Sequence, residues 1–138
     1  MAQVLVCFAY MNTKAAYLFL DDIRFPDEVA QYTNHDLKGL YLSNNWVIVK
    51  SYQEFLDYLA NNPMPGIISF DHDLGLEKSG YDCAKWLIDF LIENKTECMP
   101  EIYCHSMNPV GKENILSLFW SFERRFNNGF NCDINCRS

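Results

Sequence analysis

A short apolar run that ends in charged residues constrains the fold of this chain most strongly. Residues 66–70 read Gly-Ile-Ile-Ser-Phe, and residues 71–75 continue as Asp-His-Asp-Leu-Gly. Such a run, closed by acids and a glycine, predicts a buried strand that opens into a loop at its carboxyl end. In open α/β sheets, ligands bind outside that end of the strands. The charged residues are therefore candidates for a functional site.

The same pattern recurs along the chain and predicts a parallel sheet. Apolar runs predict further strands over residues 16–20, 46–50 and 101–104. Pro26 predicts the start of a helix. Helical spacing of apolar residues predicts further helices over 51–59, 83–95 and 110–126, whereas the polar residues 33–45 predict a loop. Alternation of strands and helices indicates one doubly wound, mostly parallel α/β sheet of four to five strands with helices on both faces.

The two ends of the chain are harder to assign. Residues 1–16 are predicted to be either an N-terminal leader or an extra edge strand, and residues 17–138 form the α/β domain. Near the C-terminus, Phe130, Cys132, Ile134 and Cys136 alternate with polar residues, which predicts a half-buried edge strand.

Composition narrows the class of protein. Apolar residues make up 49% and aromatic residues 15% of the chain, as expected of a packed core. The formal net charge of −7 argues against coating of nucleic acid by bulk attraction, but it permits a small phosphorylated ligand or an RNA end at one local site. No apolar run approaches the ~20 residues of a membrane helix. The six cysteines contain no Cys-x-x-Cys pair, which favours reduced thiols and a cytoplasmic location. Nothing in the sequence identifies a protein partner.

Polar clusters follow three of the predicted strands. Asp21 and Asp22 follow the first, Asp71 follows the central strand, and His105 follows the last. Because the carboxyl ends of parallel strands share one edge of the sheet, these clusters are expected to converge. Clustered carboxylates repel one another unless a cation lies among them. Oxygen ligands from Asp21, Asp22 and Asp71 favour Mg²⁺, with Mn²⁺ as a possible substitute.

Other residues near these strand ends suggest roles in chemistry. His72 or His105 could act as a general acid or base near neutral pH. Ser106, Asn108 and Arg24 are candidate contacts for a substrate phosphate. Asp73 is either part of the site or a residue that only stabilises its turn.

Three motifs together resemble a known family. They are LFLDDIRFP (18–26), FDHDLG (70–75) with Ser-Gly-Tyr at 79–81, and HSMNPVGKENI (105–115). The chain is similar over about residues 17–118 to the cyclic-phosphate processing receiver-like family, which is related to response-regulator receiver domains. The resemblance implies a receiver-like, flavodoxin-like fold and action on cyclic phosphates, such as 2′,3′-cyclic ends of RNA or cyclic nucleotides.

The receiver resemblance also implies roles for single residues. Asp21 and Asp22 match the receiver's metal-binding acidic pair, Asp71 its phosphoacceptor, and Ser106 its hydroxyl residue. Receivers also carry a Lys at the end of a fifth strand, but no Lys follows Lys112 here. An ordinary phosphorelay role is therefore disfavoured.

Two functions follow as hypotheses. The first is a metal-dependent phosphodiesterase that opens a cyclic phosphate, with Asp71, His72 and His105 as catalytic residues and Asp21, Asp22 and Asp71 holding the metal. The second is a receiver-like phosphoacceptor, or a module that binds a nucleotide or partner without turnover.

Overall fold

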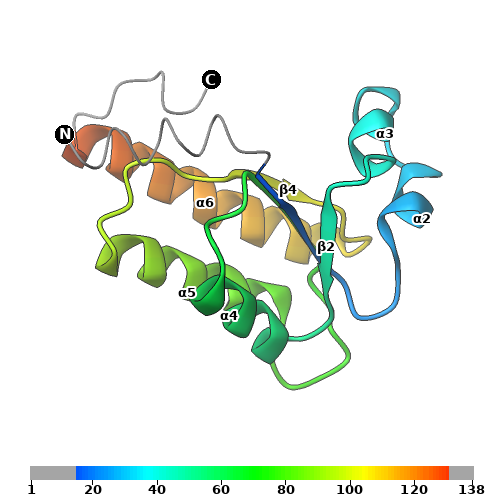
Figure 1. The fold of residues 1–138 in the computed structure, drawn as a ribbon, viewed down its shortest axis with the longest axis horizontal. Helices are drawn as coiled ribbons and strands as arrows, with labels where there is room; N and C mark the ends of the chain where they lie inside the picture. Colours follow the sequence, from blue (N-terminus) through cyan, green and yellow to red (C-terminus); the bar gives the residue numbers. More distant parts are fainter. Residues whose placement is uncertain (1–14, 131–138) are drawn as a thin grey trace.

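The structure is a computed structural model that describes residues 15–130. Its centre is a four-stranded parallel sheet in the order β2-β1-β3-β4 (Figure 1). The strands are β1 (Tyr17–Leu20), β2 (Trp46–Val49), β3 (Ile67–Phe70) and β4 (Glu101–Cys104). The helices are α2 (Pro26–Ala30), α3 (His35–Tyr41), α4 (Tyr52–Asn61), α5 (Gly80–Glu93) and α6 (Pro109–Phe130). The predicted α/β architecture is confirmed.

Alternation along the central strands sends side chains to two apolar layers. Leu18 of β1 and Phe70 of β3 belong to the larger core, which α4, α5 and α6 cover. Phe19, which follows Leu18 in β1 and points to the other face of the sheet, belongs to a smaller core with Val29 of α2 and Tyr41 of α3. Helices therefore lie on both faces of the sheet, with α2 and α3 on the opposite side from α4, α5 and α6 (Figure 1).

One sequence prediction in this region is wrong. Residues 33–45 were expected to form a loop, but α3 occupies part of that stretch. The side chain of Asn34 accepts a hydrogen bond from the backbone N–H of Leu37 and caps the helix. The helix is short and mostly exposed, so its apolar pattern is weak, and the burial of Tyr41 is what fixes it to the sheet.

The ends of the chain differ from the prediction or are not described. Helix α6 begins at Pro109 and continues to Phe130, beyond the predicted end at residue 126. Phe130 therefore lies in a helix and not in the predicted edge strand, whose other residues are outside the described part. The predicted leader or extra strand over residues 1–16 also lies almost wholly outside it.

Cys83 and Cys104 are buried in the larger core, and both are free thiols. Within residues 15–130, none of the helices combines the length and apolar character needed to cross a membrane.

Candidate metal and phosphate site

The register of the sheet brings three predicted site residues to one level. The backbone N–H of Asp71 donates to the carbonyl of Leu20 at 2.9 Å, and that of His105 donates to the carbonyl of Phe70 at 3.0 Å. Asp21, Asp71 and His105 thus leave neighbouring strands side by side at one edge of the sheet.

Asp21 is buried and its carboxylate is fully engaged. Oδ1 accepts hydrogen bonds from the backbone N–H groups of Ile23 and Arg24, both at 2.9 Å. Oδ2 accepts from Arg24 Nε and from His105 Nε2, both at 3.0 Å. Burial alone would raise the pKa of Asp21, but these donors, His105 first, outweigh it and lower the pKa to about 2. Asp21 is therefore ionised at neutral pH.

Asp71 is also buried, but its carboxylate has fewer hydrogen-bond donors than that of Asp21, and its pKa shifts in the opposite direction. Its Oδ1 accepts from the backbone N–H of His72 at 2.8 Å and from Arg24 Nη2 at 3.3 Å, but its Oδ2 accepts no hydrogen bond from the residues the structure describes. Burial, with the nearby charges of Asp21 and Asp22, raises the pKa of Asp71 to about 6. The negative charge at this position is thus incompletely compensated by the protein.

Asp22 completes an acidic cluster, which we define as Asp21, Asp22 and Asp71. One carboxylate oxygen from each residue lies within 4.8 Å of the others. The half-exposed carboxylate of Asp22 accepts no hydrogen bond from residues 15–130. An all-oxygen cluster with uncompensated charge, in which Asp22 and Asp71 Oδ2 keep spare lone pairs, suits a hard divalent cation such as Mg²⁺ or Mn²⁺. The residues present therefore fit the predicted metal.

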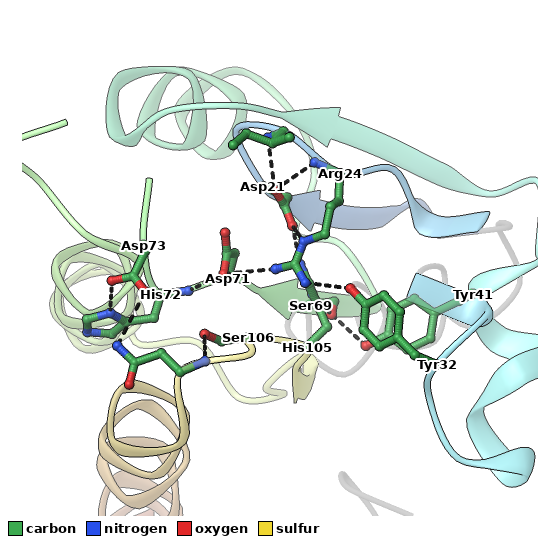
Figure 2. A network of polar contacts seen from close by, with 12 residues as sticks. Asp21, Arg24, Tyr32, Tyr41, Ser69, Asp71, His72, Asp73, His105 and Ser106 are labelled. Atoms are coloured by element: carbon green, nitrogen blue, oxygen red, sulfur yellow. Dashed lines mark hydrogen bonds and ion pairs between the residues drawn. The ribbon is translucent and has the colours of Figure 1, made fainter. Parts of the chain in front are cut away.

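Arg24 joins the two buried carboxylates. Its guanidinium contacts Asp21 through Nε and Asp71 through Nη2, and Nη1 donates to the hydroxyl of Tyr32 (Figure 2). The ring of Tyr32 also lies 5.8 Å from the guanidinium carbon. Arg24 is predicted to be a phosphate contact, and it is the only Lys or Arg among residues 15–125 that forms an ion pair with the acidic cluster.

His105 is held in the interior of the protein. Its imidazole stacks on Phe19 with 4.3 Å between ring centroids and an angle of 7° between planes. Nε2 contacts Asp21, and Nδ1 is 2.7 Å from the hydroxyl oxygen of Ser69, which is itself 2.7 Å from the hydroxyl of Tyr41. Burial lowers the pKa of His105. Both ring nitrogens are therefore occupied by protein groups.

His72 lies on another side of the site and is partly exposed. Its Nδ1 is 2.9 Å from Asp73 Oδ1, and its Nε2 has no hydrogen-bonding partner among the described residues. Figure 2 shows His72 and Asp73 on one side of Asp71, with Arg24 and Tyr32 on the other. The imidazole is turned toward Asp73 and is not placed over the Asp71 carboxylate (Figure 2).

Asp73, Asn108 and Ser106 link the loop after β3 to the start of α6. The side-chain amide of Asn108 donates to Asp73 Oδ2 at 3.3 Å, and its carbonyl accepts from the backbone N–H of Gly111 at 3.0 Å. The backbone N–H of Asn108 donates to Ser106 Oγ at 3.1 Å. These bonds place Ser106 and Asn108 beside His72, and they show that Asp73 contacts both the histidine and the next loop.

Two glycines allow helices to approach this loop. A Cβ at Gly80 would come within 1.7 Å of the Asp71 carbonyl oxygen, and the backbone N–H of Gly80 donates to the carbonyl of His72 at 2.7 Å. A Cβ at Gly111 would come within 2.4 Å of the His72 ring. The first turns of α5 and α6 are therefore packed directly against Asp71 and His72.

The structure thus gathers the predicted residues at one sheet edge, but not around one point. Asp21, Asp22, Asp71, Arg24 and His105 form one connected group, and a second group contains His72, Asp73, Ser106 and Asn108. The backbone of His72 connects the two groups through its bond to Asp71.

Sequence reasoning missed five residues that shape this site: Tyr32, Tyr41, Ser69, Gly80 and Gly111. Ser69 carried a usable signal, since it is the one hydroxyl in an otherwise apolar strand. The two glycines lie within recognised motifs, but their role depends on which backbone or ring approaches them. Tyr32 and Tyr41 gave no signal, because their partners are distant in the sequence.

Fold and site together define a receiver-like α/β domain with an acidic cluster at the carboxyl edge of its sheet. Residues 16–121 match the family described as Cyclic-phosphate processing Receiver domain. The chain belongs to this family, and the resemblance seen in its three motifs is confirmed. The family's name associates its members with cyclic-phosphate processing.

Other comparisons add little. No curated protein matched the chain. One solved structure, described as a yeast Spc42 trimeric coiled coil (amino acids 181–211) fused to another structure, is 12% identical. It matches over 89% of this chain and 85% of its own, with a TM-score of 0.49. With a TM-score this low, nothing about the present chain follows from it.

Proposed function

We propose that this protein is a metal-dependent phosphodiesterase that opens a cyclic phosphate. The observation that carries the proposal is the acidic cluster, in which Asp71 is buried with an incompletely compensated charge, in a chain that belongs to a cyclic-phosphate processing family. The acidic cluster of Asp21, Asp22 and Asp71 is where Mg²⁺ or Mn²⁺ would bind, and Asp22 and the Oδ2 of Asp71 are its oxygens that accept no hydrogen bond from the described residues. When bound, the cation would neutralise charge on the phosphate and lower the pKa of a nearby water.

The chain's own residues would bind the phosphate beside the acidic cluster. Arg24 can donate to a phosphate oxygen from the face where it now contacts Asp71. Ser106 and the amide of Asn108 supply further donors at the start of α6. Recognition would thus rest on a small number of local contacts, in agreement with the acidic net charge of the whole chain.

His72 is the proposed proton-transfer residue. Asp73 is largely exposed and the hydrogen bond from His72 lowers its pKa, so its carboxylate accepts the Nδ1 proton. In its neutral form the imidazole would present a lone pair on Nε2, which could take a proton from the attacking water and return it to the ester oxygen that leaves as the P–O bond of the ring breaks. A substrate would have to extend from the acidic cluster toward this ring. His105 has no corresponding free nitrogen, and we assign it a supporting role in place of the predicted acid–base role.

The test is hydrolysis of a panel of 2′,3′- and 3′,5′-cyclic nucleotides and cyclic-ended RNA, with and without Mg²⁺. We expect turnover of at least one substrate with Mg²⁺ and loss of turnover in Asp22→Asn. Asp27→Asn, at an exposed acid in the first turn of α2, is the matched control and should retain turnover. A folded, metal-loaded protein that opens none of these rings would exclude the proposal.

A second function is favoured by one feature of Asp71. Its Oδ2 accepts no hydrogen bond among the described residues and is free to attack a phosphoryl group. In that case the domain would be a phosphoacceptor or a binding module without turnover. Acetyl phosphate or beryllofluoride should then give a Mg²⁺-dependent adduct that is lost in Asp71→Asn, whereas the enzyme should give products and no stable adduct.

A further inference from the structure

We propose that Tyr41 and Ser69 are positioning residues of this site. With His105 they form a one-way chain of hydrogen bonds that holds Asp21 against Arg24 and leaves Asp22 and Asp71 as the direct ligands of the metal. This inference rests on the proposed function only in assuming that a divalent cation binds the acidic cluster. We call the hydrogen-bonded residues Tyr41, Ser69, His105 and Asp21 the buried chain.

The buried chain is continuous from the sheet-facing side of helix α3 to the edge of the sheet. Tyr41 contacts Ser69 at 2.7 Å, Ser69 contacts His105 Nδ1 at 2.7 Å, and His105 Nε2 contacts Asp21 Oδ2 at 3.0 Å. These four residues are 2%, 0%, 7% and 1% exposed. Water therefore does not supply alternative partners, and each group depends on its neighbours in the chain.

The direction of each hydrogen bond follows from the last member. The other three contacts of the Asp21 carboxylate all come from N–H groups, so we assign His105 Nε2–H as its fourth donor. In a neutral imidazole the other nitrogen then accepts, so the hydroxyl of Ser69 donates to Nδ1. The oxygen of Ser69 is left to accept from Tyr41. Every bond in the chain therefore points toward Asp21.

Packing prevents the chain from reversing by rotation of the rings. His105 stacks on Phe19 and meets the edge of Tyr41, with 6.2 Å between centroids. Tyr41 in turn stacks on Trp46 at 5.5 Å and 7°. Since Tyr41 belongs to α3 and Trp46 to β2, the orientation of His105 depends on packing against elements other than the strand that it follows.

The number of hydrogen-bond donors at Asp21 decides which residues of the acidic cluster can bind the metal directly. Four N–H groups occupy its two oxygens, two on each. A carboxylate offers about four lone-pair positions, so Asp21 has none to spare while Arg24 and His105 stay in place. Asp22 and Asp71 Oδ2 accept nothing from the described residues. Asp21 therefore orients Arg24, and the two other acids bind the cation.

The first experiment measures the tautomer of His105 by ¹⁵N NMR on the metal-free protein. We expect Nδ1 to be unprotonated and Nε2 protonated in the wild type, and Ser69→Ala to change the ¹⁵N shift of Nδ1 because its donor is lost. A wild-type His105 that carries its proton on Nδ1 would overturn the proposed direction of the chain.

The second experiment measures Mn²⁺ affinity by electron paramagnetic resonance together with the melting temperature. Loss of groups that orient metal-site residues costs about 10–100-fold in metal affinity. We expect about 10-fold weaker binding in Ser69→Ala and about 3-fold in Tyr41→Phe, which removes only the distal hydroxyl. Tyr103→Phe is the matched control, because its hydroxyl bonds to the exposed Glu101 outside the buried chain, and it should bind Mn²⁺ normally.

The direct ligands are tested in the same assay. Asp22→Asn should lower Mn²⁺ affinity more than 100-fold, far beyond the effect of Ser69→Ala. Normal affinity in both Tyr41→Phe and Ser69→Ala, or no binding of Mn²⁺ by the folded wild type, would overturn the proposal. Neither readout involves turnover, so normal metal binding with no hydrolysis of cyclic phosphates would contradict the proposed function and leave this inference standing.

Discussion

Two histidines follow neighbouring strands, and each forms a hydrogen bond to an aspartate, yet their surroundings differ. His105 is buried, stacked on Phe19, and has both ring nitrogens occupied. His72 is partly exposed and has one nitrogen occupied by Asp73. An acid–base group needs a nitrogen that a reacting atom can reach. The comparison shows that the residue type alone does not assign the role, because burial and the number of partners decide it.

The largest expected difference is that loss of His72 lowers turnover, whereas loss of His105 lowers the stability of the fold. His72→Gln should lower the turnover number by ~10²–10⁴ because it removes a proton-transfer group. His105→Gln should instead lower the free energy of unfolding by ~2–4 kcal/mol, since it removes a buried, stacked ring and its hydrogen bonds. Steady-state kinetics at saturating Mg²⁺ and urea unfolding measure the two effects. Unchanged turnover in His72→Gln would remove His72 from the mechanism.

The two buried acids should respond in opposite directions when they are neutralised in the metal-free protein. The pKa of Asp71 is raised from 3.8 to about 6, which corresponds to about 3 kcal/mol of unfavourable energy for its charged form. Asp71→Asn should therefore raise the free energy of unfolding at pH 7.5, by up to about 3 kcal/mol. The pKa of Asp21 is lowered from 3.8 to about 2. Asp21→Asn should lower stability by a similar amount or more, because its amide would face two donors.

Chemical unfolding at pH 7.5 in the presence of a chelator measures both changes. A loss of stability in Asp71→Asn as large as that in Asp21→Asn would contradict the contrast between the two carboxylates.

The pH dependence of stability should carry the sign of the raised pKa of Asp71. Between about pH 4 and 6 the folded state binds this proton and the unfolded state does not, so stability falls as pH rises through that window. The difference in unfolding free energy between Asp71→Asn and the wild type should grow with pH up to about 6 and then level off. Urea unfolding of both proteins without metal, from pH 4 to 7.5, tests this. A difference that is constant with pH would show that the Asp71 pKa is not raised.

The smallest expected effect concerns the position of the His72 ring. In Gly111→Ala the added methyl must displace the imidazole, and we expect turnover to fall by roughly 10-fold through misplacement of that ring. Stability should change by less than ~1 kcal/mol, since the helix gains from the loss of glycine what the contact costs. Gly39→Ala in α3 is the matched control, because its Cβ would meet nothing within 4 Å. Equal turnover in the two variants would mean that the ring position is unimportant.

The sequence by itself determined the architecture and the acidic cluster. Apolar runs that end in acids are visible without coordinates, and parallel strands necessarily bring their carboxyl ends to one edge, so Asp21, Asp22 and Asp71 could be grouped in advance. The metal they would hold remains a prediction from the same chemistry of oxygen ligands.

Only the tertiary structure separated the two histidines and revealed what surrounds the acids. The partners of His105 are Ser69 on β3 and Tyr41 on α3, a helix that the polar stretch 33–45 did not predict. Likewise, the space available to His72 depends on a glycine in α6. Such contacts join residues far apart in the chain, and no local pattern encodes their distances. The sequence placed the chemical groups at the sheet edge, and long-range packing decided which of them remain free to act.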